Sequence, residues 1–329
     1  MSLSADVLQY LSRYIDNDND KYYFMATCKN FIMAPILFTG EYRCSSILKS
    51  SLYHNFINVH VDYPNSNGKI KCFPKNVKRL YIDRFMEGIW RMIPSTVTHL
   101  IFDKHSECIF IDKIPSSVIY LDLGGKSIKN IPPAVKYLTL RHRQEHAENI
   151  PSSVTHLLIG YMKNDSVPSF ITHLKIEGFE WRDYFVLKPG CIPTSVTHLV
   201  FGNHFNKNID GLIPSSVTHL TFGKHFRKST YNKIPSSVTH LIFGDLFFCE
   251  RKIPNSVTHL TLANKRGYSY ISPSVTHLVV HKKYLGNIPT TVKFVSHKRL
   301  PMYDSPLGEF EVEISNLINN SESSSEDDY

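Results

Sequence analysis

Eight of the seventeen histidines stand at the same position of a short motif, Val/Ile-Thr-His-Leu, that recurs along the chain. A neutral imidazole is a common zinc ligand, and it also transfers protons near neutral pH. If successive copies of the motif lie side by side, neighbouring imidazoles could share a metal ion. The eight residues are His99, His156, His173, His198, His219, His240, His259 and His277.

Other copies of the motif argue against a metal site in this column of histidines. Arginine, tyrosine and phenylalanine take the same position at Arg79, Tyr120, Tyr137 and Phe294. A ligand set does not tolerate such replacements, and no carboxylate or cysteine recurs beside the histidines. We therefore expect a structural stack of rings without a metal. The threonine before each histidine is expected to supply β-propensity and local hydrogen bonds rather than nucleophiles.

The rest of the sequence offers no motif of a catalytic site. It contains no glycine-rich phosphate loop, no G-x-S-x-G or H-E-x-x-H sequence and no kinase signature. The six cysteines form no C-x-x-C pair and are unevenly spaced, which argues against a zinc ribbon and a disulfide framework. We therefore expect no enzymatic activity, no cofactor, and a reducing compartment, the cytosol or the nucleus.

The histidine motif belongs to a longer repeat, read most clearly as IPSSVTHLxF. Twelve copies follow one another at spacings of 17 to 25 residues, a period typical of solenoid proteins. The third and fifth residues after the anchoring valine are apolar in nearly every copy, whereas the residue between them varies. This period of two predicts one short β-strand per copy, with parallel strands because the connections are short and run one way. The anchors are Val77, Val97, Val118, Val135, Val154, Ile171, Val196, Val217, Val238, Val257, Val275 and Val292.

This repeat resembles a leucine-rich repeat, with V-x-x-L-x-F in place of L-x-x-L-x-L. More specifically, PSSVTHLxFG is similar to the strand of the FNIP repeat family, named for a Phe-Asn-Ile-Pro core. Asn-Ile-Pro occurs at residues 130–132, 149–151 and 287–289. The resemblance covers residues 71–300 and implies a curved solenoid that recognises other proteins without catalysis.

Residues 1–45 do not repeat, and Val7, Leu8, Leu11 and Ile15 mark one face of a helix. LSADVL (residues 3–8) and TCKNF (residues 27–31) are similar to the beginning and end of an F-box, with serine in place of proline and phenylalanine in place of tryptophan. The resemblance implies a small helical module that docks on a Skp-type adaptor. The residues it assigns to this contact are Leu3, Val7, Leu8, Leu11, Phe24, Cys28 and Phe31.

Charge is unevenly distributed along the chain. Seven of the 29 acidic residues and none of the 37 basic residues lie in residues 309–329, so the rest of the chain is strongly basic. We expect residues 301–329 to be a disordered acidic tail and residues 46–70 to be a connector. The basic body suits acidic partners, and nucleic-acid binding is the weakest of the hypotheses. No stretch approaches the roughly 18 apolar residues of a membrane span, so we expect no membrane partner.

The sequence thus predicts an α+β chain, a small all-α N-terminal F-box-like module followed by a parallel-β, leucine-rich-repeat-like solenoid of about twelve repeats. An F-box with FNIP repeats is a pairing known from large amoeba-infecting DNA viruses and social amoebae. The resemblance implies a substrate-recognition subunit of a cullin–RING ubiquitin ligase, in the host cytosol if the protein is viral. The alternative is a stand-alone scaffold or decoy that binds host proteins without a ligase. We expect the target on the sheet face, at His173, Lys175, His198, Val200, His219, Thr221, His240, Ile242, His259 and Thr261.

Overall fold

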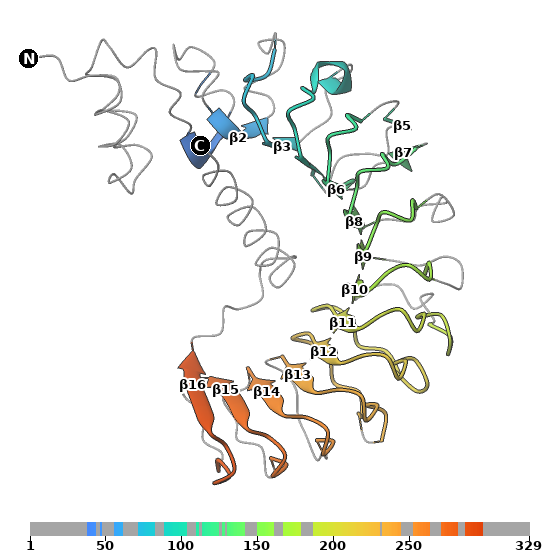
Figure 1. Ribbon diagram of the computed structural model, residues 1–329, viewed down its shortest axis with the longest axis vertical. Coiled ribbons are helices and arrows are strands. Elements are labelled where there is room, and N and C mark those ends of the chain that lie inside the picture. Colours follow the sequence, from blue (N-terminus) through green and yellow to red (C-terminus); the bar gives the residue numbers. More distant parts are fainter. Residues whose placement is uncertain are drawn as a thin grey trace, which may run out of the picture. The chain divides into compact units, whose positions relative to one another are not determined.

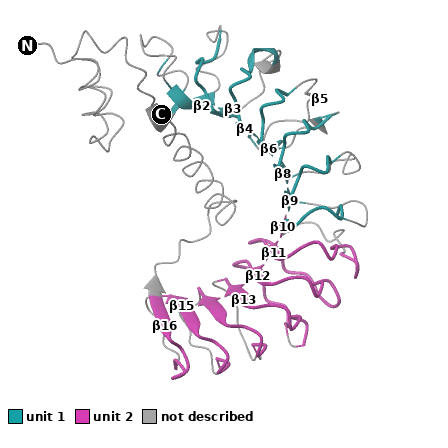
Figure 2. Cartoon of the chain, in the orientation of Figure 1, with its two compact units in different colours: residues 1–174 teal, residues 175–329 magenta. Residues whose placement is uncertain are grey.

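The chain folds into two compact units, Met1–Leu174 and Lys175–Tyr329 (Figure 2). The boundary between the two units falls within strand β10 (His173–Ile176), after Leu174. The computed structural model describes residues 38–43, 47, 56–61, 72–82, 89–103, 110–111, 114–124, 127–128, 130–141, 150–160, 167–178, 187–230, 232–244, 253–263, 271–281 and 287–298.

The first unit stacks parallel strands in the order β1, β2, β3, β4, β6, β8, β9, β10 (Figure 1). A second, two-stranded sheet pairs β5 with β7, and the 3-10 helix η3 (Ile89–Met92) lies in a connection. The strands are β1 (Phe38–Arg43), β2 (Phe56–Val61), β3 (Arg79–Ile82), β4 (His99–Phe102), β5 (Phe110–Ile111), β6 (Tyr120–Asp122), β7 (Ser127–Ile128), β8 (Tyr137–Leu140) and β9 (His156–Ile159).

The second unit stacks six parallel strands in sequence order, each one repeat after the last. The register is the same throughout, so that His219 pairs with His240 and Phe222 with Phe243. Equivalent residues of successive repeats therefore form straight columns. The strands are β11 (His198–Phe201), β12 (His219–Phe222), β13 (His240–Phe243), β14 (His259–Leu262), β15 (His277–His281) and β16 (Phe294–Lys298).

The IPSSV segment turns the chain into each strand and ties each repeat to the preceding one. In the repeat of β13, the Val238 N–H donates to the Pro235 carbonyl at 3.2 Å, which closes the turn. The Ser237 hydroxyl donates to the carbonyl of Val217, one repeat earlier, at 2.7 Å. Proline can occupy this turn because its missing N–H is not needed there. The serine is therefore a structural residue, since it pairs a carbonyl that the strand ladder does not reach.

The core contains the three apolar columns of the repeat, together with residues outside them such as Phe205 and Phe226, which are fully buried. Ten anchoring valines and Ile171, at Val77 to Val275, are fully buried, and so are the leucines three residues later. On the third column, the rings of Phe201, Phe222 and Phe243 stack at centroid distances of 5.6 and 5.5 Å. Burial of a side chain of this size contributes about 1.5–3 kcal/mol each.

A column of glycines follows the third apolar column in the second unit. A Cβ built on Gly223 would lie 2.4 Å from the carbonyl carbon of Gly202, and one on Gly244 would lie 2.6 Å from that of Gly223. The Gly223 and Gly244 amides donate to Phe201 and Phe222 carbonyls at 2.7 and 2.8 Å. Glycine is therefore required here by close backbone contact between repeats.

The expected α+β class is wrong. The described residues form a parallel β-solenoid, in which only η3 and the single residue Ile47 are helical, and no all-α module is seen among them. The segments expected to end the module and to form the connector instead supply β1 and β2 to the sheet. The reason is that Phe56, Val59 and Val61 have the spacing of the anchor and of the two core residues after it, and fill the core columns at 1% exposure or less.

Two other expectations concern residues outside the described part of the chain. These are the adaptor-contacting residues Leu3 to Phe31 and the acidic tail at 301–329. Among the described residues, no helix is both long and apolar enough to cross a membrane.

Candidate target-binding face

Five histidine rings form a continuous stack along one face of the second unit. They belong to β11 through β15, where parallel pairing brings the same position of each repeat side by side. Neighbouring ring centroids lie 4.1, 4.1, 4.1 and 4.2 Å apart, and the ring planes are within 16° of parallel. The rings therefore lie closer together than the ordinary strand spacing of about 4.8 Å, in offset contact. They are His198, His219, His240, His259 and His277.

A threonine hydroxyl orients each ring. The Thr239 Oγ1 lies 2.9 Å from Nδ1 of His240 and 3.4 Å from the carbonyl oxygen of Thr218 in the preceding repeat. That carbonyl also accepts the amides of Thr239 and His240, at 2.9 and 3.0 Å. The same threonine–histidine contact, at 2.8 to 3.0 Å, recurs in all eight histidine repeats. Nδ1 is thereby engaged within the repeat, which leaves Nε2 for other contacts.

The stack has the wrong geometry for a shared metal ion. The lone pair of an imidazole nitrogen lies in the ring plane, so the lone pairs of parallel stacked rings point alongside one another and do not converge. Among the described residues, no group of three or more His, Cys, Asp or Glu side chains could hold a metal. The close stacking thus favours the structural interpretation of the histidine column.

Three rings of the stack, those of His219, His240 and His259, are held neutral. Burial, and then the neighbouring histidines, lower the pKa of His219 and of His240 from 6.5 to about 4. The pKa of His259 is also lowered, by burial and then by His277. Both causes act in the same direction, since a charged ring loses solvation and meets other rings of the same charge.

A groove of about 510 Å³ runs over this stack. Beside the rings it is lined by the variable column, which is the position between the two core residues of each strand. The lining residues of this column are Thr221, Ile242, Thr261 and Val279. None of the side chains that line the groove is Asp, Glu, Lys or Arg. The groove therefore presents histidine rings, threonine hydroxyls and aliphatic groups, and no carboxylate, ammonium or guanidinium group.

The equivalent face of the first unit is built differently. Its ring column reads His99, Tyr120, Tyr137, His156, His173, with centroid spacings of 5.8, 6.4, 4.4 and 4.0 Å. Interplanar angles reach 40° in this column. Mixed ring sizes prevent uniform stacking, and here the pKa of His99 is lowered to about 4 by burial and then by Arg79.

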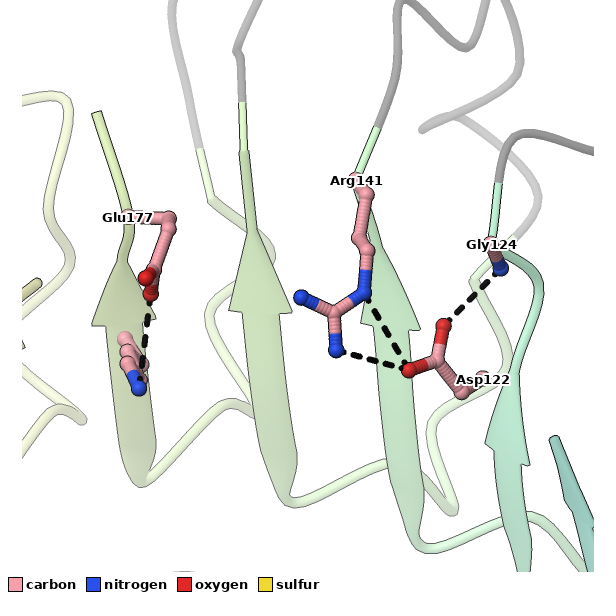
Figure 3. A network of polar contacts seen from close by, with 5 residues as sticks. Asp122, Gly124, Arg141 and Glu177 are labelled. Carbon is pink, nitrogen blue, oxygen red and sulfur yellow. Dashed lines mark hydrogen bonds and ion pairs between the residues drawn. The ribbon is translucent and has the colours of Figure 1, made fainter. Parts of the chain in front are cut away.

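A buried ion pair occupies the variable column of the first unit (Figure 3). Asp122 is 2% exposed; its Oδ2 accepts from Arg141 Nη2 and Nε at 2.9 and 3.2 Å, and its Oδ1 accepts from the Gly124 amide at 2.9 Å. Burial raises the pKa of Asp122, against the opposing charge of Arg141. Gly124 has φ +57°, and a Cβ there would lie 2.3 Å from the Asp103 carbonyl oxygen.

Comparison with known proteins agrees with this repeat geometry. The sequence profile described as FNIP Repeat matches residues 64–104, 87–126, 186–225 and 228–265. The chain carries FNIP repeats. An FNIP repeat-containing protein of Acanthamoeba polyphaga mimivirus is 36% identical over 195 residues, which cover 54% of this chain and 43% of that protein. An F-box and FNIP repeat-containing protein of the same virus is 29% identical over 126 residues, 33% of this chain and 41% of that protein.

The chain spans about two fifths of the length of the curated relatives that it matches. Among solved structures, the crystal structure of CroV588, described as a circular LRR protein, matches with a TM-score of 0.48 at 24% identity. That match covers 74% of this chain and 39% of CroV588.

Within the FNIP repeats, the structure places the expected target-face residues on two adjoining columns. His198, His219, His240 and His259 lie in the stack, and Thr221, Ile242 and Thr261 lie beside them in the groove. Val200 is half-buried in the variable column of β11, and His173 stacks on His156 at 4.0 Å in the first unit. Lys175 is only 8% exposed, and its Nζ lies 3.3 Å from Glu177 Oε2 (Figure 3), so its charge is committed within the repeat.

The expected target face did not include four residues that shape the two faces. His277 and Val279 extend the groove, and the column pattern contained both. Asp122 and Arg141 pair although they stand 19 residues apart. A lone carboxylate in an apolar strand was the available signal, because burying it requires a cation or several donors close by.

Proposed function

We propose that this FNIP repeat protein is a protein-binding scaffold, and that it holds its target in the groove of the second unit. The observation that supports the proposal most directly is the groove itself, to which five successive repeats contribute a histidine and four of them also the variable residue. Repeat proteins recognise partners through surfaces that extend over several repeats. Non-catalytic binding also agrees with a face in which histidines are stacked against one another instead of being paired with a nucleophile or an acid.

The chemistry of the groove indicates the kind of segment that it accepts. Its lining contains no Asp, Glu, Lys or Arg, and His219, His240 and His259 are held neutral, so a charged segment would lose solvation there without gaining an oppositely charged partner. Aliphatic and aromatic side chains would gain from burial against Ile242 and Val279, and amide or hydroxyl groups could pair with Nε2 of the rings. We therefore propose an uncharged, partly apolar peptide segment as the ligand.

Paired substitutions test the groove as the binding surface. Ile242→Glu with Thr261→Glu places two carboxylates in the groove at half-buried positions. Ser215→Glu with Ser236→Glu adds the same charge at exposed turn positions of the second unit. In pull-downs from the native host cells, we expect the groove variant to lose the proteins that wild type and the turn variant retain. Equal retention by all three would show that the target binds elsewhere.

A finer proposal is that the scaffold is the substrate-recognition subunit of a cullin–RING ubiquitin ligase. It is supported by the F-box similarity of residues 3–8 and 27–31, and by the relative named as an F-box and FNIP repeat-containing protein. In this proposal residues 1–45 dock on a Skp-type adaptor, which links the chain to a cullin. The solenoid holds the target close to a catalytic partner, and this chain contributes proximity.

Adaptor capture separates the ligase subunit from a stand-alone scaffold or decoy. Leu8→Asp with Phe31→Asp places charge on the proposed contact, and burying an unpaired carboxylate costs several kcal/mol. Asn17→Asp with Asn19→Asp adds the same charge within the acidic DNDND segment. We expect a recombinant Skp-type adaptor to bind the wild type and the second variant but not the first. If the wild type captures no adaptor, the scaffold or decoy function remains.

A further inference from the structure

The second unit ends on an incompletely covered strand. β16 pairs with β15, and within the described residues no strand lies on its other side. The anchor Val292 and the following core residue Val295 are half-exposed, although their counterparts Val275 and Leu278 are fully buried. Phe294 is 56% exposed. An open strand edge beside exposed core side chains is a site for another strand.

The opposite end of the solenoid shows how this chain covers its first recognisable repeat. β2 pairs with β3 and β1 pairs with β2, although neither contains the IPSSVTHL motif. β2 continues the core columns with Val59 and Val61, separated by His60. Phe56, which is 1% exposed and lies opposite the anchor Val77 in this register, completes the three apolar positions of the repeat. A degenerate rung of this chain can therefore lack the proline turn and the histidine.

The sequence after β16 contains two of these three apolar positions at the repeat spacing. Pro306 follows Pro289 by 17 residues, the spacing that also separates Val118 from Val135 and Val275 from Val292. From Pro306 the chain reads PLGEFEVEI, which aligns with PSSVTHLxF. The alignment puts Val312 and Ile314 on the two core columns of the strand. Glutamates take the anchor, histidine and variable positions at 309, 311 and 313.

We propose that residues 306–314 form a thirteenth rung, which pairs in parallel with the open edge of β16. Val312 would then extend a core column over Val295, and Ile314 would lie next to His297, which pairs with Val280. The Lys293 carbonyl would accept amides of residues 310 and 311, as the Thr276 carbonyl does from Lys293 and Phe294. The last rung faces solvent on its outer side, which explains why polar glutamates can replace the motif there.

This rung would make the tail a docked segment of the solenoid up to residue 314. It would protect the edge of β16 against pairing with other chains, which is the usual hazard of an open strand. The expected disorder would then begin after residue 314, in the serine-rich acidic stretch. The occupant is this chain's own segment because it begins only eight residues after Lys298 and carries the repeat's spacing.

Hydrogen exchange on the full chain tests the docked rung. Val312→Asp with Ile314→Asp puts charge on the two proposed core positions. The matched control, Leu317→Asp with Ile318→Asp, adds the same charge just beyond the rung. We expect the first variant to speed amide exchange across residues 294–298 about tenfold or more, as truncation after residue 304 should, because local opening becomes easier. The control should leave that exchange unchanged.

The same variants distinguish a strand from a docked helix. A helix would use Phe310, Ile314 and Leu317, which are spaced for one helical face, and would leave Val312 off it. A stronger effect of Leu317→Asp than of Val312→Asp would overturn the proposal. So would unchanged exchange at residues 294–298 in the truncated chain, or protection that depends on protein concentration and thus comes from a second copy.

Discussion

The sheet faces of the two units are built from the same repeat but present different side chains. In the second unit the ring column is all histidine from β11 to β15, the rings stack at about 4.1 Å, and the groove over them is lined by no Asp, Glu, Lys or Arg. In the first unit tyrosines interrupt the column and a buried carboxylate takes a variable position. Uniform repeats thus produce an open, continuous surface, whereas divergent repeats fill the same face with fixed internal contacts.

The largest loss of folding stability should follow a substitution in the variable column of the first unit. Asp122→Ala would leave Arg141 facing a low-dielectric site without its carboxylate, and it would remove the acceptor of the Gly124 amide. Breaking a buried pair in this way costs about 3 kcal/mol. The equivalent change in the second unit, Thr221→Ala, removes no charge and should cost about 1 kcal/mol or less. Denaturant unfolding of both variants measures the contrast, which similar costs for the two would contradict.

Acid should weaken the second unit through its histidine stack. The folded pKa of His219 and His240 is about 4, below the ordinary 6.5, so folding favours the neutral rings. Stability from this source is complete above about pH 6.5 and is lost as the pH falls towards 4, because the unfolded chain binds protons first. Screening at these half-exposed rings limits the loss to about 1–2 kcal/mol across the stack.

Tyrosine, which the column already contains in the first unit, provides the matched change for this pH effect. His219→Tyr with His240→Tyr keeps an aromatic ring at each position and removes two titrating groups. We expect the unfolding midpoint of this variant to fall less between pH 7 and pH 4 than that of wild type. An identical pH slope for both proteins would mean that acid acts on other groups.

A smaller effect should follow loss of the hydroxyl that orients each ring. Thr258→Val removes the 2.9 Å contact with Nδ1 of His259 and the 3.4 Å contact with the Thr239 carbonyl. We expect a cost of about 1 kcal/mol and a shift in the ring nitrogen resonances of His259. Thr261→Val, in the same repeat but in the groove, is the control and should cost less. If the two variants unfold alike, the threonine column contributes only its β-propensity.

Comparison of the repeats predicted the core because the same positions of each repeat are buried. Positions such as Val238, Leu241 and Phe243 are restricted to apolar types by burial, and twelve strands lie where the pattern predicted them. β2 was missed because Tyr53 stands where proline opens a recognisable repeat, and only the alternation of Val59 and Val61 remained as a signal. Degenerate ends are thus the hardest part of a solenoid to find from its motif.

The sequence predicted which face of the sheet carries the candidate site, but it did not predict how deeply each side chain on that face is buried. The alternation places the variable column on the open face, yet Asp122, Lys175 and Thr221 are buried there. Exposure of a strand side chain depends on its neighbours in the adjacent strands, about 4.8 Å away, and one repeat does not specify them. The pairing of Lys175 with Glu177 is likewise a property of the folded repeat, which the column comparison could not supply.

The smallest effect tests whether the first unit can be converted towards the second. Tyr137 lies 4.4 Å from His156, ring to ring, and is preceded by Lys136, whose amide donates to the Ile119 carbonyl at 2.9 Å. Tyr137→His alone gives a ring with no threonine hydroxyl for Nδ1, so we expect a cost of about 1 kcal/mol. Adding Lys136→Thr restores the pair found in every histidine repeat and should recover about 0.5 kcal/mol, measured as the coupling in a double-mutant cycle. Strictly additive changes in stability would mean that ring contacts alone align the histidine stack. The threonines of the second unit would then not be the cause of its uniform face.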